Sequence, residues 1–184
     1  MADYTTLSLA DFTALWPSII LAGGGLIALL LEVSPPALRR MAGPFSILAL
    51  VLSALALYWG GVTGLDPATN ALAAEVGTDY LTLAFAPAFY LSALAALLLG
   101  GPYLKRAGFL RAEYHALILF SAAGMVLLTQ ARDLLMLFLA LETLSIPLYV
   151  LSGFFTNKER SIESALKYFT TGAFSSAFVA MGMA

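Results

Sequence analysis

The sequence contains no cysteine, one histidine and few charged residues. The absence of cysteine excludes disulfides, iron–sulfur clusters and thiolate metal ligands from its 184 residues. A single histidine, with no HExxH-type pair, gives no reason to expect a dedicated metal site. Asp, Glu, Lys and Arg make up only 11% of the chain, whereas soluble proteins contain about 25%. A soluble domain of this length is therefore not expected.

Other common signals are also missing. There is no glycine-rich phosphate-binding loop, since the three glycines at 23–25 lie inside an apolar run, where small residues favour close helix packing. The first apolar run has no Lys or Arg ahead of it and no clear small-residue cleavage site after it, so it does not resemble a signal peptide. We expect this chain to bind no cofactor and no nucleic acid.

Long hydrophobic runs dominate the sequence, with 61% hydrophobic residues and a mean hydropathy of +0.91. A helix needs about 20 apolar residues to cross the hydrocarbon core of a membrane. The runs are continuous and lack the alternation of barrel strands. The sequence therefore predicts one all-α, polytopic transmembrane helix bundle with spans at 14–33, 43–62, 80–101, 114–131, 134–155 and 161–184. Pro17 and Pro44 fit helix starts, whereas Pro87 and Pro147 are expected to kink or loosen their spans.

Basic residues in the connections predict the orientation. Seven of the nine Lys and Arg residues fall in the segments 34–42, 102–111 and 156–160. These segments follow the first, third and fifth predicted spans, so they lie on the same side of the membrane. The N-terminal segment and the segment 63–79 contain acidic residues and no Lys or Arg. The positive-inside rule places the three basic segments in the cytoplasm and the N-terminus outside. The segment 63–79 is expected to hold a short surface strand or hairpin.

One carboxylate, Glu142, lies in the middle of the apolar run 134–155. It is about eight residues from the outer end of that span, or roughly 12 Å deep. A short side chain at this depth does not reach bulk water, so the acid is expected to contact protein, to line a hydrated cavity or to be protonated. Ionisable residues within spans are costly, which favours proton transport. A structural acid that joins helices is the alternative.

Three neighbours on the same span are expected to support Glu142. Ser145 and Tyr149 follow it at i+3 and i+7, so their hydroxyl groups lie on the same helical face. Pro147 lacks an amide hydrogen and leaves the carbonyl of Thr143 without its helical donor. A loosened helix beside the acid also makes room for water.

Lys167 lies inside the next apolar run, about seven residues beyond Arg160 and roughly 10 Å deep. Its side chain leans toward the helix start, where it can extend to the interface or pair with Glu163 one turn earlier. If the two spans turn near residue 157 or 158, Glu142 and Lys167 are offset by roughly 8–9 Å along the helix axis. A gap of that size suits one or two waters, and coupled groups in a low dielectric form a proton relay.

Other ionisable residues lie nearer the membrane surface. Glu32 is expected at the cytoplasmic interface. His115 is a weak candidate for proton transfer, because a lone histidine at an interface is more often structural. Arg132 and Asp133 are expected to cap the turn between the fourth and fifth spans and the start of the fifth.

Two stretches of the sequence are distinctive: LALETLSIPLYVL around Glu142 and ESALKYFTTGAFSSAF around Lys167. Together they resemble the antiporter-like membrane subunits of respiratory complex I, above all subunit N of NADH–quinone oxidoreductase. The resemblance covers the residues from Tyr114 onward, and upstream only the pattern of spans and basic loops agrees. It implies that Glu142 and Lys167 are the buried glutamate and lysine of the family's proton relay.

The resemblance also implies a wider setting. The fold would be part of a larger bundle with inverted repeats, in a bacterial inner (plasma) membrane. The other membrane subunits of complex I and the bilayer would be its partners, with quinone involved indirectly. FMN, iron–sulfur clusters and quinone would be bound by partner subunits. Since the sequence stops at Ala184, an N-terminal fragment of a longer protein is expected.

Two alternatives to a proton-pumping subunit are kept. One is a subunit of a multisubunit cation/proton antiporter, which shares the Glu and Lys pattern. The other is a non-catalytic membrane assembly scaffold in which Glu142 and Lys167 are structural. A genomic neighbourhood of NADH dehydrogenase genes or of antiporter genes distinguishes the first alternative.

Overall fold

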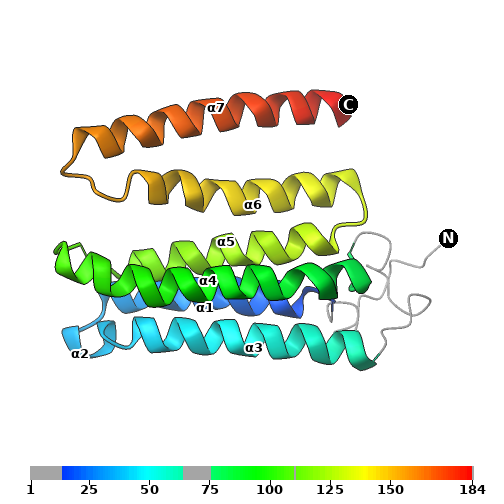
Figure 1. The fold of residues 1–184 in the computed structure, drawn as a ribbon, viewed down its shortest axis with the longest axis horizontal. Helices are drawn as coiled ribbons and strands as arrows, with labels where there is room; N and C mark the ends of the chain where they lie inside the picture. The colour runs from blue at the N-terminus through cyan, green and yellow to red at the C-terminus, as the bar shows by residue number, and fades with distance from the viewer. Residues whose placement is uncertain (1–13, 64–75, 110, 184) are drawn as a thin grey trace.

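The computed structural model describes residues 14–63, 76–109 and 111–183, most of which are helical. The helices lie side by side along one direction (Figure 1). In chain order they are α1 (Trp16–Val33), α2 (Pro36–Arg39), α3 (Ala42–Thr63), α4 (Tyr80–Arg106), α5 (Ala112–Gln130), α6 (Leu134–Ser152) and α7 (Glu159–Met183). This arrangement confirms the predicted all-α polytopic bundle.

Five segments are long and apolar enough to cross a membrane. They are α1, the segment Ala37–Gly60 that contains most of α3, and the helices α4, α5 and α6. α7 occupies the sixth predicted span and is also a long helix, but it does not meet the same measure of apolarity. Its early turns contain the charged residues Glu159, Arg160, Glu163 and Lys167, followed by several Ser and Thr residues. A sixth span at 161–184 therefore stays a prediction.

The core is built around α5, which packs against α1, α3, α4 and α6. Small residues let these helices approach closely: a Cβ on Gly24 would lie 2.8 Å from the Cβ of Ala49, whereas Gly23 faces open space. The predicted packing role of the three glycines thus holds for Gly24 and for Gly25, which meets Phe120. The buried hydrophobic cluster consists of Leu21, Ala49, Leu50, Leu57, Ala86, Tyr90, Ala93, Leu119, Ala122, Ala123 and Val126.

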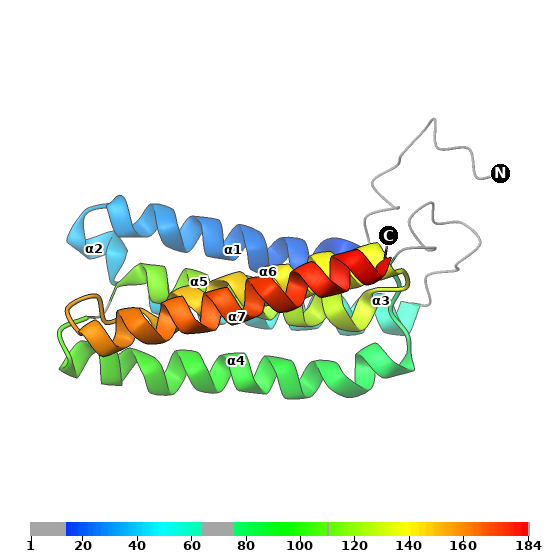
Figure 2. The ribbon, with the colours of Figure 1, turned by 90° about the horizontal axis from the view of Figure 1, so that it is seen from above.

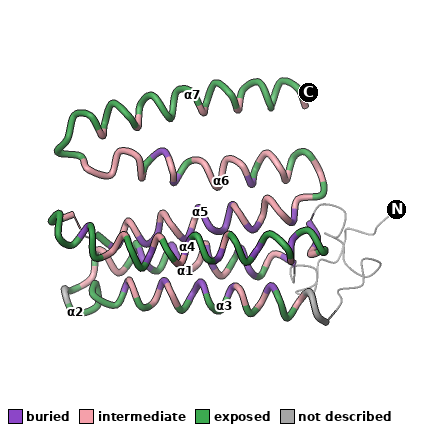
Figure 3. Tube along the Cα trace, viewed as in Figure 1, coloured by how far each residue is buried: buried purple, intermediate pink, exposed green. Residues whose placement is uncertain are grey.

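The α6–α7 hairpin lies outside this core. α6 packs on α5, and α7 packs on α6, so that α7 forms one edge of the row of helices (Figure 1). Turned by 90°, the structure shows α1 and α4 on either side of α5, α6 and α7 (Figure 2). No residue of α7 is buried, as its green and pink trace shows (Figure 3). The outer face of α7 is therefore available to lipid or to further protein.

The two ends of the bundle differ in their connections. The α1–α3, α4–α5 and α6–α7 connections, which contain the basic residues, lie at one end (Figure 1). The opposite end contains the α5–α6 turn and residues 76–79. The strand or hairpin predicted for 63–79 falls mostly on residues 64–75, outside the described residues. Val76 forms one antiparallel bridge with Ala131, and the N–H of Gly77 donates to the carbonyl of Gln130 at 2.9 Å.

Buried Gln130 joins three segments at that end. Its Nε2 donates to the carbonyl of Ala14 at 2.8 Å and to the Thr78 hydroxyl at 3.2 Å. Because the side chain is only 1% exposed, these bonds replace contacts with water. They hold the start of α1 and the approach to α4 against the end of α5.

The start of α6 and the place of Pro17 follow the sequence, whereas the kinks expected at Pro87 and Pro147 stay predictions. Asp133 caps α6 as predicted, since its Oδ1 accepts from the Met136 N–H at 2.6 Å, while Arg132 lies against Gly77. Pro17 lies in the first turn of its helix, and α4 and α6 continue through Pro87 and Pro147. α4 extends to Arg106, five residues beyond the predicted end of the third span at residue 101, and its last turns bury Leu104.

Asp79 caps α4, and we expect Asp79→Ala to lower the free energy of unfolding by about 1 kcal/mol at neutral pH. Oδ1 of Asp79 accepts from the N–H and the hydroxyl of Thr82, at 2.9 and 3.1 Å. The bond from the Thr82 N–H is the main cause that lowers the pKa of Asp79 below its ordinary value of 3.8. The stability that this charge contributes is present above that value and is lost as the pH falls through the lowered pKa.

Thermal unfolding followed by circular dichroism measures this effect. The parent protein should unfold at a higher temperature than the variant at about pH 7, and the difference should shrink as the pH falls below 3.8 and the carboxylate is protonated. Equal unfolding temperatures at neutral pH would show that the cap contributes nothing.

Candidate functional site

Glu142 lies on the face of α6 that meets α7. It is half-buried and borders a cavity of about 190 Å³ between the two helices. As predicted from their spacing, Ser145 and Tyr149 line the same cavity. The remaining lining residues are Phe138 and Leu141 from α6 and Gly172, Ser175, Ser176 and Val179 from α7.

Ser176 is the direct partner of the acid. Its hydroxyl donates a hydrogen bond to Oε1 of Glu142, which joins the middle of α6 to α7. Sequence reasoning missed this residue. A signal was present, because Gly172, Ser175 and Ser176 recur at i, i+3 and i+4 and form a small, polar stripe on an otherwise apolar run.

Tyr149 fixes the spacing between α6 and α7. Its ring packs edge-on against those of Tyr168 and Phe169, with centroids 4.8 and 5.8 Å apart. Its hydroxyl lies over Gly172, where a Cβ would overlap it. The glycine therefore admits a polar tyrosine tip between the helices, next to the cavity that contains Glu142.

The backbone of α6 beside Glu142 is held by α5. A Cβ on Gly124 would overlap backbone atoms of Thr143 and Leu144, so the two helices touch there along their main chains. The Ser121 hydroxyl of α5 also donates to the carbonyl of Leu144 at 3.4 Å. Pro147 follows and is buried. These contacts set the position from which the acid reaches α7.

Lys167 lies in a different environment. Its Nζ pairs with Oε1 of Glu163 at 2.5 Å, one turn earlier, and its side chain is 75% exposed. Pairing with Glu163 is one of the two arrangements that the sequence predicts for this lysine. None of the contacts within the described part of the chain joins Lys167 to Glu142.

The offset between the two groups is larger than the turn count predicts. Ser176 contacts Glu142 and lies nine residues after Lys167, which places Lys167 about 13–14 Å further toward the basic end. The predicted 8–9 Å is therefore wrong. The reason is that α7 begins beyond the end of α6, after the non-helical residues 153–158 (Figure 1). Residues 153 and 165 then face each other, since a Cβ on Gly153 would meet that of Ala165.

Tyr149 lies between these two levels. Its hydroxyl is at Gly172, four residues before Ser176 and five residues after Lys167. At 1.5 Å per residue, it divides the offset into steps of roughly 6 and 7–8 Å. One or two waters span steps of this size.

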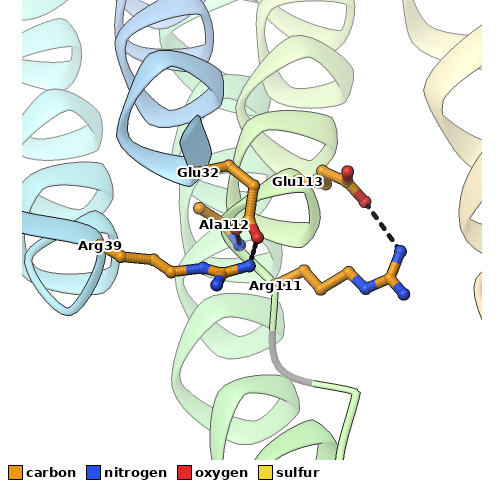
Figure 4. A network of polar contacts seen from close by, with 5 residues as sticks. All are labelled: Glu32, Arg39, Arg111, Ala112 and Glu113. Atoms are coloured by element: carbon orange, nitrogen blue, oxygen red, sulfur yellow. Dashed lines mark hydrogen bonds and ion pairs between the residues drawn. The ribbon is translucent and has the colours of Figure 1, made fainter. Parts of the chain in front are cut away.

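Glu32 lies at the basic end, as expected of an interfacial residue. Its carboxylate pairs with the Arg39 guanidinium and accepts from the backbone N–H of Ala112 at 2.5 Å (Figure 4). It therefore joins the end of α1 to α2 and to the start of α5.

Comparison with known proteins identifies the family to which the chain belongs. The profile described as "NADH:quinone oxidoreductase/Mrp antiporter, TM" matches residues 131–184, which include Glu142, Lys167 and Ser176. NADH-quinone oxidoreductase subunit N of Chloroflexus aggregans is 34% identical over 99% of the chain and 37% of its own length. The protein of the same description from Sorangium cellulosum, subunit N 1, is 36% identical over 95% of the chain and 37% of its own length. The chain belongs to the subunit N family.

One relative matches a shorter part of the chain at higher identity. The relative from Salinibacter ruber is 47% identical over 94 residues, which are 51% of this chain and 19% of the relative. The chain spans a little over a third of the length of the relatives from Chloroflexus and Sorangium. With five segments long and apolar enough to cross a membrane, it is a multi-pass membrane protein of this family.

Proposed function

We propose that this chain is part of a proton-translocating membrane subunit of NADH–quinone oxidoreductase. The observation that carries the proposal is Glu142, a carboxylate in the middle of a membrane-length helix with a hydroxyl partner on the next helix and a cavity beside it. Ionisable groups at such depth are costly and mark pathways for ions and protons. The relatives named subunit N supply the reaction that would drive the protons.

In the proposed relay, Glu142 and Lys167 exchange protons through the space between α6 and α7. At about 13–14 Å and an effective dielectric of 20, two unit charges interact by only about 1 kcal/mol. Direct coupling is therefore weak, and transfer requires groups between them. The Tyr149 hydroxyl, at Gly172, supports two short steps instead of one long one. The cavity next to Ser145 supplies room for water.

Glu163 holds Lys167 in place in this proposal. The i, i+4 pair stabilises the charged lysine at the basic end of α7. Delivery of a proton toward Glu142 would require the lysine to leave this carboxylate. The pair lies on α7 at the edge of the bundle, and the other described helices do not enclose it.

The setting of the proposed subunit follows from the family and the charge pattern. The basic end would face the cytoplasm of a bacterial cell. A protease that cleaves the segment 156–160 in inverted membrane vesicles, but not in right-side-out vesicles, would support this orientation. Other membrane subunits of complex I would contact this chain. FMN, iron–sulfur clusters and quinone would be bound by partner subunits.

A cation/proton antiporter subunit is the second candidate, because the matching profile names both kinds of protein. Such a subunit would exchange protons for sodium or potassium without NADH. The relatives described as subunit N favour the first proposal.

Replacing Lys167 by Met tests the relay. We expect proton translocation per NADH oxidised to fall several-fold in membrane vesicles, because the side chain can no longer take up a proton. Lys105→Met, at the exposed end of α4, is the matched control and should leave that ratio unchanged. A normal ratio in Lys167→Met with normal assembly would instead support a scaffold role.

A further inference from the structure

A second cavity, of about 480 Å³, lies at the basic end of the bundle. It is formed where the end of α4, the start of α5 and the connection through α2 meet. Its polar lining consists of Arg39, Arg40, Arg111 and His115, and Gly43 and Gly108 form part of its wall. None of these residues takes part in the proposed relay.

The guanidinium groups at this cavity exceed the acids that face them. Glu32 pairs with Arg39 and also binds the Ala112 N–H, which fixes both against the start of α5 (Figure 4). Glu113 lies 3.7 Å from Arg111, and both of these side chains are about half exposed. Three guanidiniums thus face two carboxylates, and each guanidinium has five N–H donors. Donors remain for a further anion.

His115 contributes a buried edge to the same cavity. The side chain is only 7% exposed, and its Nε2 would lie 3.3 Å from a Cβ on Gly43. Because residue 43 is a glycine, this edge of the imidazole stays open toward the cavity. A neutral or charged imidazole can donate to an anion there.

The place of the cavity selects the kind of anion. It lies at the end of helices long enough to cross a membrane, at the level where the phosphates of a bilayer lie. Exposed apolar residues are neighbours of its lining residues in the chain. Leu38 and Met41 flank Arg39 and Arg40, and Tyr103 follows Gly101 by two residues; their exposed fractions are 46%, 57% and 60%. These surfaces suit acyl chains, and arginines suit the phosphate that joins those chains to a headgroup. We propose that the cavity binds the phosphate of an anionic phospholipid.

Lipid binding to the full-length protein, purified with its accompanying subunits, tests the proposal. Native mass spectrometry would compare binding of phosphatidylglycerol and phosphatidylcholine to the parent protein and to the double variant Arg40→Gln, Arg111→Gln. At about 1 kcal/mol for each basic residue, phosphatidylglycerol should bind on the order of thirty-fold more weakly to the variant. The control Lys158→Gln, Arg160→Gln removes two charges at the same end, outside the cavity lining, and should change little.

Two further arms separate the outcomes. The single variant Arg40→Gln changes one exposed side chain and should keep the fold. It should weaken the binding of phosphatidylglycerol by about five-fold. Inorganic phosphate, added alone at millimolar concentration, should displace little of the bound lipid because it has no acyl chains. Equal binding of phosphatidylglycerol to parent and variants would overturn the proposal. Full displacement by inorganic phosphate would assign the cavity to a free anion instead.

Discussion

Replacing Glu142 by Gln should lower NADH-driven proton translocation by about ten-fold or more, because glutamine keeps the shape and the Ser176 contact but cannot exchange a proton. Acidification measured with a pH-sensitive dye in inverted membrane vesicles, divided by NADH oxidised, is the appropriate readout. The bundle should still assemble, since Glu142 is bonded between α6 and α7, outside the core around α5.

Three further variants serve as controls for the Glu142→Gln result. Glu159→Gln removes an exposed carboxylate at the start of α7 and should leave the ratio of protons to NADH unchanged. Ser176→Ala keeps the acid but removes its donor, so a partial loss is expected. Ser175 also lines the cavity, but its hydroxyl donates to the carbonyl of Thr171 within its own helix. Ser175→Ala should therefore leave the ratio of protons to NADH unchanged. Normal proton translocation by the Glu142→Gln variant would contradict the proposed relay.

Replacing Gly124 by Ala should destabilise the protein by about 3 kcal/mol or more, near the upper end of what overpacking costs. A Cβ there would lie 2.7 Å from Cα of Leu144. Backbone atoms cannot move aside as the end of a side chain does, so α5 and α6 must separate. Separation would also shift Glu142, which lies two residues before the contact. Thermal unfolding in detergent micelles and the amount of protein in the membrane both report this loss.

Gly23→Ala is the matched control for that prediction. It makes the same substitution in the middle of a helix, at a position where a Cβ would meet nothing within 4 Å. Its effect should stay within about 1 kcal/mol and can be favourable, because Ala is the better helix former. Equal unfolding temperatures for the two variants would mean that the α5–α6 contact is looser than described.

Five of the six predicted spans coincide with segments long and apolar enough to cross a membrane, because each is a continuous apolar run. The start of α6 could be predicted because Asp133 is a strong N-cap residue. The extent of α4 beyond residue 101 could not be predicted in this way. The helix continues through Pro102 to Arg106, and Leu104 in its last turns is buried, a tertiary contact that an apolar run does not reveal.

The site could be predicted along one helix but not between helices. Spacing placed Ser145 and Tyr149 beside Glu142, because helical periodicity is local. The level of Lys167 depended on how residues 153–158 connect α6 and α7, and a count of residues does not fix an irregular turn. Ser176 was missed for the same reason, since the register of two helices decides which of several serines meets the acid.

That register has a mechanical consequence. One turn from Ser176 in either direction along α7 the chain has Gly172 and Ala180, and three residues away it has Ala173 and Val179. None of these side chains can donate a hydrogen bond. A slide of α7 by one turn, about 5.4 Å, would exchange a hydroxyl for an apolar surface opposite Glu142. The register of α7 on α6, which Gly172 permits beneath Tyr149, therefore decides whether the carboxylate meets a hydroxyl group or an apolar surface.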